Sequence, residues 1–81
     1  MFYVYALYSN EYKKIYIGFT SDLEKRLFSH NHGLKKGYTS KFRPWTVIYS
    51  EEISDKKSAL RRERQLKTAQ GREFIKSLLR I

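Results

Sequence analysis

Two short hydrophobic runs near the N-terminus predict two β-strands. The first run, 2–8, is rich in aromatic and β-branched residues, and the second covers 13–19. A short polar break at 9–12 separates them, which favours an antiparallel hairpin. With this loop length, Tyr5 is expected opposite Tyr16.

The same register divides the hairpin into two unlike faces. One face would carry only the apolar side chains of positions 2, 4, 6, 15, 17 and 19, and is expected to face the core. The other, less apolar face would carry Tyr3, Tyr5, Tyr16 and Gly18. Two tyrosines would therefore lie together, beside a glycine that leaves space for an approaching group.

Helical periodicity begins after residue 20. Ser21 and Glu24 have the spacing of a capping box, so a helix is expected to begin there. It would run to about residue 32 and end at Gly33. Arg26 and His30 are one turn apart on the flank of the apolar stripe, so they can act on one target.

The second half of the chain predicts a third strand and two further helices. A loop is expected over 33–44, and a strand over 45–50. Ser54 or Asp55 would cap a long basic helix that runs to about Ala69. Gly71 then breaks the pattern before a short C-terminal helix. The order ββαβαα makes residues 1–81 a single small α+β domain.

Composition narrows the range of functions. Cysteine is absent, which excludes a disulfide framework, a thiolate metal site and a cysteine nucleophile. Polar residues interrupt the first twenty positions, so we expect no signal peptide, no membrane span and a cytoplasmic location. The net charge of +9 favours a polyanionic partner, above all nucleic acid. A membrane surface is disfavoured because the basic helix has only a narrow apolar stripe.

Glu63 is the unusual residue of the basic helix, because it lies in the middle of the apolar stripe. A carboxylate in that position needs a partner. A neighbouring lysine or arginine can supply a structural ion pair. Alternatively, the carboxylate can bind a hard divalent cation such as Mg²⁺, which accepts one carboxylate together with water and phosphate oxygens. The residues alone leave both interpretations open.

The other polar candidates also have two interpretations each. Arg26 can stabilise phosphate charge through bidentate hydrogen bonds, or it can pair with Glu24. His30 can act as a general base or orient one, or it can be a packed histidine. Tyr5 and Tyr16 can belong to the core, stack on bases or take part in catalysis.

Together these residues resemble the GIY-YIG endonuclease superfamily. The resemblance rests on Tyr3-Val4-Tyr5, Tyr16-Ile17-Gly18, Arg26, His30 and the segment 62–67. The first motif half reads Tyr-Val-Tyr where the family has Gly-Ile-Tyr. The chain is most similar to small stand-alone bacterial members, and it is also similar to the N-terminal incision domain of the excision-repair nuclease. The resemblance implies a three-stranded antiparallel sheet flanked by helices.

The resemblance also implies metal-dependent hydrolysis of phosphodiester bonds, as in relatives that act in DNA repair. Tyr5 and Tyr16 match the two motif tyrosines, one of which helps to activate water or attacks as a nucleophile. Arg26 matches the arginine that contacts the scissile phosphate, and His30 falls where the family carries His or Tyr. Glu63 matches the single glutamate that binds the metal, which we expect to be Mg²⁺ or Mn²⁺.

Basic side chains elsewhere are expected to contact phosphates without reading sequence. These are Lys35, Lys36, Lys41, Arg43 and Lys67. DNA is expected more than RNA, and a homodimer or a protein partner would be needed to cut both strands. Two other functions fit the same residues. One is a non-catalytic module that binds nucleic acid through charge and tyrosine stacking, and the other is an accessory subunit whose basic helix docks on an acidic protein.

Overall fold

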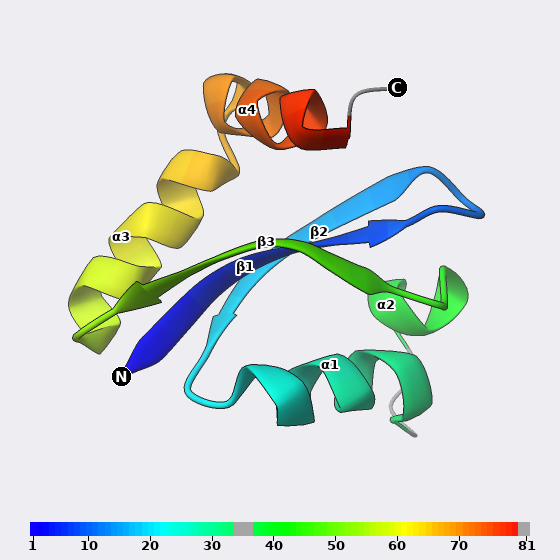
Figure 1. The fold of residues 1–81 in the computed structure, drawn as a ribbon, viewed down its shortest axis with the longest axis horizontal. Coiled ribbons are helices and arrows are strands. Elements are labelled where there is room, and N and C mark those ends of the chain that lie inside the picture. The colour runs from blue at the N-terminus through cyan, green and yellow to red at the C-terminus, as the bar shows by residue number, and fades with distance from the viewer. Residues whose placement is uncertain (34–36, 80–81) are drawn as a thin grey trace.

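A three-stranded antiparallel sheet lies between two pairs of helices (Figure 1). The structure, a computed structural model, describes residues 1–33 and 37–79. Its elements are β1 (Phe2–Ser9), β2 (Lys14–Thr20), α1 (Leu23–His32), α2 (Tyr38–Lys41), β3 (Thr46–Ile53), α3 (Lys56–Leu66) and α4 (Ala69–Leu79). The α+β class and the order ββαβαα are confirmed. The short helix α2 is added within the segment that the sequence predicted to be a loop.

The strand order is β2-β1-β3, so β1 is the central strand, and residues 4–9 are all buried. Val4 and Ala6 face α3 and α4, as the pattern predicted. The opposite face is also buried, because Tyr5 and Leu7 form a second core with Trp45 beneath α1 and α2. The pattern of the hairpin had predicted only one core face. A central strand covered on both sides reads as a continuous apolar run, and 2–8 is such a run.

The hairpin register differs by two residues from the predicted one. Tyr5 pairs with Gly18 and not with Tyr16. The turn explains the difference: Lys13 adopts a left-handed conformation (φ 57°), and its amide donates to the carbonyl of Ser9 at 2.7 Å. A shift of two residues keeps each side chain on its face. The two tyrosines therefore share a face, as predicted, but lie diagonally across the strand pair.

The N-cap of α1 lies one residue after the predicted cap at Ser21. The cap is Asp22, whose carboxylate accepts a hydrogen bond from the amide of Lys25 at 3.1 Å. The predicted capping box of Ser21 and Glu24 was therefore wrong, because aspartate at the next position is an equally good cap. The predicted end at Gly33 is confirmed.

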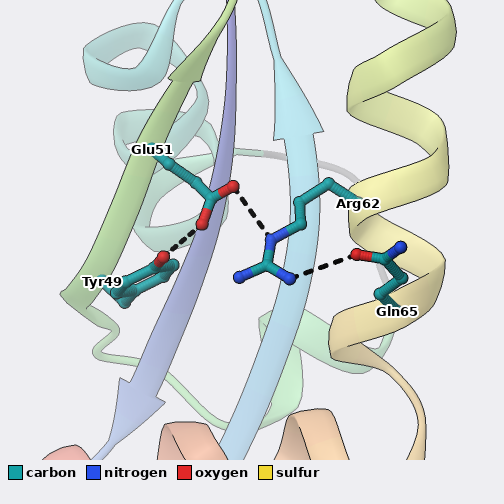
Figure 2. A network of polar contacts seen from close by, with 4 residues as sticks. All are labelled: Tyr49, Glu51, Arg62 and Gln65. Carbon is teal, nitrogen blue, oxygen red and sulfur yellow. Dashed lines mark hydrogen bonds and ion pairs between the residues drawn. The ribbon is translucent and has the colours of Figure 1, made fainter.

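Strand β3 extends to Ile53, three residues beyond its predicted end. The added residues carry a polar network that joins β3 to α3 (Figure 2). The Arg62 guanidinium donates to Glu51 at 2.9 Å and to Gln65 at 3.2 Å, and the Tyr49 hydroxyl donates to the second oxygen of Glu51. Burial alone would raise the pKa of Glu51, but the hydrogen bonds from Tyr49 and Arg62 outweigh it and lower that pKa. The network joins α3 to β3 through side chains, beside the buried contacts of Ala59 and Leu66.

The sequence predicted a break between two helices at Gly71. In the structure Gly71 lies inside α4. The cap of α3 at Asp55 is confirmed, but α3 ends at Leu66, before the predicted boundary at 69. A Cβ at position 71 would lie 2.3 Å from the Gln65 carbonyl oxygen and 2.4 Å from the Leu66 Cα. Glycine therefore serves the close approach of α4 to the end of α3. None of the described helices is long and apolar enough to span a membrane.

Gly71→Ala is expected to destabilise the protein. Overpacking against backbone costs about 1–3 kcal/mol, which exceeds the roughly 1 kcal/mol that alanine gains in helix propensity. Urea unfolding measures the change in the free energy of unfolding. Gly37→Ala is the matched control, because among the described residues, its chain neighbours aside, a Cβ there would meet no atom within 4 Å. Equal stability of the two variants would contradict the packing role of Gly71.

Candidate active site

A cleft of about 380 Å³ opens along the outer edge of β2. Residues from both faces of the hairpin line it, together with residues of α1 and α3. The lining residues are Phe2, Tyr5, Tyr16, Gly18, Phe19, Thr20, Ser21, Arg26, Lys56 and Glu63. The structure therefore brings together four of the five residues predicted to be catalytic, from four different elements of the fold. The fifth, His30, contacts Tyr5 and is buried.

Gly18 sets the position of Tyr5. The two residues are direct partners in the β1–β2 ladder, and the Tyr5 ring lies over the glycine. A Cβ at position 18 would lie 2.8 Å from the Tyr5 hydroxyl and 3.1 Å from the Tyr16 ring. The contact with the Tyr5 hydroxyl is too short to be kept, whereas the Tyr16 ring would need to move by only a few tenths of an ångström. Glycine at this position therefore serves mainly the placement of Tyr5. Tyr5 itself is only 1% exposed.

Tyr5 and His30 share a buried hydrogen bond. The Tyr5 hydroxyl lies 2.9 Å from Nε2 of His30, and the imidazole tautomer decides which group donates. Burial raises the pKa of Tyr5, and the neighbouring Tyr16 raises it further. Burial lowers the pKa of His30, and the positive charges of Arg26 and Arg43 lower it further. At neutral pH the pair therefore consists of a neutral phenol and a neutral imidazole.

Tyr16 completes an aromatic cluster around this hydrogen bond. Its ring meets the His30 ring edge-on, with centroids 4.8 Å apart, and lies 6.3 Å from the Tyr5 ring. Tyr16 is half-buried, so part of its ring remains open to the cleft. The His30 ring is therefore held between its hydrogen bond to Tyr5 and its edge-on contact with Tyr16.

Arg26 is exposed on α1 at the mouth of the cleft. In residues 1–33 and 37–79 no carboxylate lies within ion-pair distance of its guanidinium. The pair with Glu24 that the sequence offered as an alternative is thus not formed. The guanidinium is available for a bidentate contact with a phosphate.

Glu63 stands in the cleft wall with 16% of its side chain exposed, and Nζ of Lys67 lies 3.7 Å from its carboxylate. The structural ion pair considered from sequence is therefore present. It is a long contact with a half-exposed lysine, and such pairs contribute only about 0–1 kcal/mol. Among the described residues no group of three or more histidines and carboxylates surrounds it. Glu63 alone suits a hard cation that takes its remaining ligands from water and phosphate oxygens.

The residues expected to contact phosphates are dispersed. Lys41 is exposed at the end of α2, and Lys67 lies beside Glu63. The Arg43 guanidinium is engaged within the protein, because it donates to the carbonyl oxygens of His30 at 2.7 Å and Gly33 at 2.6 Å. These contacts satisfy the carboxyl end of α1. The other two, Lys35 and Lys36, lie outside the described residues.

Lys56 lines the cleft, although the sequence analysis did not select it as a site residue. It is the first residue of α3, seven positions before Glu63. Two helical turns separate the two residues, so they project from the same side of the helix. The spacing of seven residues from Glu63 could have pointed to Lys56, but other basic residues of α3 surround it in the sequence and made it hard to single out.

The buried position of His30 predicts a dependence of stability on pH. As the pH falls through the ordinary pKa of 6.5, the unfolded chain takes up a proton that the folded protein resists. Stability contributed by this site is therefore complete above that pH and declines below it. His30→Gln should flatten the slope of Tm against pH below about pH 6.5. His32→Gln is the control, since His32 is exposed. A wild-type slope in His30→Gln would refute this assignment.

Comparisons with known proteins identify the family. The model of the GIY-YIG catalytic domain matches residues 1–76. UPF0213 protein SH2523 of Staphylococcus haemolyticus is 34% identical over 76 residues, covering 94% of this chain and 92% of that protein. UPF0213 protein CPE1444 of Clostridium perfringens is 37% identical over 67 residues, or 83% of this chain and 71% of that protein.

A solved structure has the same fold. The solution NMR structure of UPF0213 protein BH0048 from Bacillus halodurans aligns with a TM-score of 0.55 and 28% identity, covering 96% of this chain and 85% of that one. Five residues of the cleft belong to the motifs on which the resemblance to the family rested, namely Tyr5, Tyr16, Gly18, Arg26 and Glu63. The chain belongs to the GIY-YIG catalytic domain family, alongside the small UPF0213 proteins.

Proposed function

We propose that this protein is an endonuclease that hydrolyses phosphodiester bonds in DNA, with one Mg²⁺ or Mn²⁺ held by Glu63. The family supports an endonuclease-type function. The observation that carries the proposal is the convergence of Tyr5, Tyr16, Arg26 and Glu63 in one cleft, although they come from four elements. Two phenols, a guanidinium and a carboxylate are thereby placed around one cleft, where they can act on the same phosphate.

Substrate binding begins with the positive groups of the cleft. Arg26 and Lys56 enter from α1 and α3, so they can hold a phosphate from two sides. The planar guanidinium of Arg26 offers two parallel donors, whereas the Lys56 ammonium acts as a point charge. Charge that develops on the phosphoryl oxygens during attack is stabilised by groups already in place, which is the efficient form of electrostatic catalysis.

The Tyr5–His30 pair is suited to move a proton. The raised pKa of Tyr5 keeps its hydroxyl protonated, so tyrosinate is not the resting base. The lowered pKa of His30 keeps the imidazole neutral, so Nε2 can accept the hydroxyl hydrogen. As water attacks the phosphorus, its proton passes to the Tyr5 oxygen and the original hydroxyl proton passes to His30. The bond between phosphorus and the leaving oxygen breaks, and that oxygen takes a proton from solvent. Tyr16 packs on His30 and orients the pair.

Glu63 is the residue that would hold the divalent cation. When bound, such a cation supplies Lewis-acid polarisation of the phosphate and neutralises charge on the leaving oxygen. The carboxylate of Glu63 forms a long ion pair with the half-exposed Lys67. Such a pair is weak, so a divalent cation can displace the lysine. The network in Figure 2 joins α3 to β3 through Arg62, the residue before Glu63.

Glu63→Gln tests the proposal with almost no change in side-chain size. Cleavage of a plasmid or a labelled oligonucleotide in Mg²⁺ or Mn²⁺ should fall by roughly 100-fold or more, because a fixed charge at the transition state is lost. Binding of the same DNA in EDTA, measured by fluorescence anisotropy, should change little. Glu73→Gln, on the exposed side of α4, is the control and should cleave as the wild type does.

Three results would contradict the proposal. Cleavage by Glu63→Gln at the wild-type rate would place the metal elsewhere or indicate a contaminating nuclease. Cleavage by the wild type in EDTA would exclude the metal dependence. Tight DNA binding without cleavage of any substrate would instead identify a non-catalytic module that retains the nuclease fold.

A further inference from the structure

Aromatic rings continue beyond the cleft, along β2 toward the hairpin turn. Tyr16 at the cleft wall stacks with Tyr38 of α2 at a centroid distance of 6.5 Å. Tyr38 meets Phe42 edge-on at 4.9 Å, and Phe42 meets Tyr12 of the turn at 5.4 Å. These four rings, Tyr16, Tyr38, Phe42 and Tyr12, form an aromatic strip that begins at the site of the proposed chemistry.

The outer rings of the strip are more exposed than packing requires. Tyr38 is 49% exposed and Tyr12 is 47% exposed, whereas Trp45, which lies 6.2 Å from Tyr38, is 3% exposed. Trp45 already anchors α2, because its indole donates to the carbonyl oxygen of Thr39 at 2.8 Å. The exposed faces of Tyr38 and Tyr12 are therefore not needed to hold the helix in place.

Positive charge accompanies the strip. Nζ of Lys14 lies 5.4 Å from the centre of the Phe42 ring, and Lys13 and Lys41 are exposed at either side in the turn and in α2. Lys14, Tyr16 and Gly18 alternate along β2, so they share one face of the strand. Apolar ring faces beside ammonium groups complement a strand that offers bases and phosphates together.

We propose that the aromatic strip binds unpaired bases of the DNA strand whose backbone enters the cleft. The inference rests on the proposed nuclease function and defines its substrate class as single-stranded or branched DNA. Bases in a continuous duplex have both faces covered by their neighbours, so they have none to offer to Tyr38 or Tyr12. The strip begins at Tyr16, which also lines the cleft, so a strand whose phosphate lies in the cleft can bring its neighbouring bases onto the strip.

The chain offers well-matched variants for a test. Tyr38→Leu and Tyr12→Leu keep apolar bulk but remove the ring, and the corresponding phenylalanine variants keep the ring. Phe28→Leu is the control, because Phe28 is 66% exposed on α1 and pairs only with His32 among the described rings. Thermal unfolding of each variant verifies that it is folded.

Binding is measured in EDTA by fluorescence anisotropy with three labelled probes of equal length. These are an oligothymidylate, a blunt duplex and an abasic oligomer that carries the phosphates without bases. We expect each leucine variant to weaken oligothymidylate binding by about 5- to 100-fold, the range for loss of one stacked base. Binding of the duplex and of the abasic oligomer should stay within about twofold of the wild type, since their phosphate contacts are unchanged. The phenylalanine variants and Phe28→Leu should bind all three as the wild type does.

Equal losses on all three probes would overturn the proposal, since the rings would then support the fold or the charge and not bind bases. An unchanged affinity of both leucine variants for oligothymidylate would overturn it as well. Because these measurements need no cleavage, they separate the two proposals. Base-dependent loss of binding without any nuclease activity supports the strip and refutes the enzyme, whereas cleavage without such a loss does the reverse.

Discussion

The close contact between Tyr5 and Gly18 is the constraint on which the site depends. Tyr5 belongs to the central strand, yet its hydroxyl must reach the outer edge of the sheet. It does so only because its ladder partner has no side chain, since a Cβ there would lie 2.8 Å from the hydroxyl. The buried ring then places its hydroxyl against His30, and the same burial shifts the pKa values of both groups so that both remain neutral. A small sheet thereby holds the Tyr5–His30 hydrogen bond at the wall of the cleft, where the proposed mechanism uses it.

The remaining charges are positioned by packing on the two faces of the sheet. Arg26 comes from α1 on one face, and Glu63 comes from α3 on the other, so the cleft is lined by residues of helices from both faces of the sheet. Helix α3 is joined to β3 by the Tyr49–Glu51–Arg62 network, and α4 approaches its end closely at Gly71. Residues outside the cleft therefore help to hold the helix that carries Glu63.

Sequence patterns were sufficient to predict the order of the elements, both ends of α1 to within two residues and the separation of the hairpin faces. They were also sufficient to select four cleft residues, because motif spacing and strand periodicity do not depend on the exact register. The register itself did not follow, because a left-handed residue at Lys13 is a property of the turn that composition does not specify. The role of Gly71 was missed for a similar reason. From sequence alone a glycine predicts a helix break, whereas here its missing side chain makes room for the backbone at the end of α3. Lys56 was hidden among many basic neighbours, and the contacts of Arg43 with the end of α1 depend on tertiary structure.

The measurement that tests the account most directly is a double-mutant cycle of cleavage rates between Tyr5 and Gly18. The wild type, Tyr5→Phe, Gly18→Ala and the double variant are compared on one oligonucleotide, at a temperature where all four are folded. If Gly18 acts by positioning the Tyr5 hydroxyl, removing that hydroxyl makes the added methyl group irrelevant to proton transfer. The double variant should then cleave within about twofold of Tyr5→Phe, which is a strongly non-additive result. Additive losses, with the double variant slower than Tyr5→Phe by the full factor of Gly18→Ala, would contradict the account.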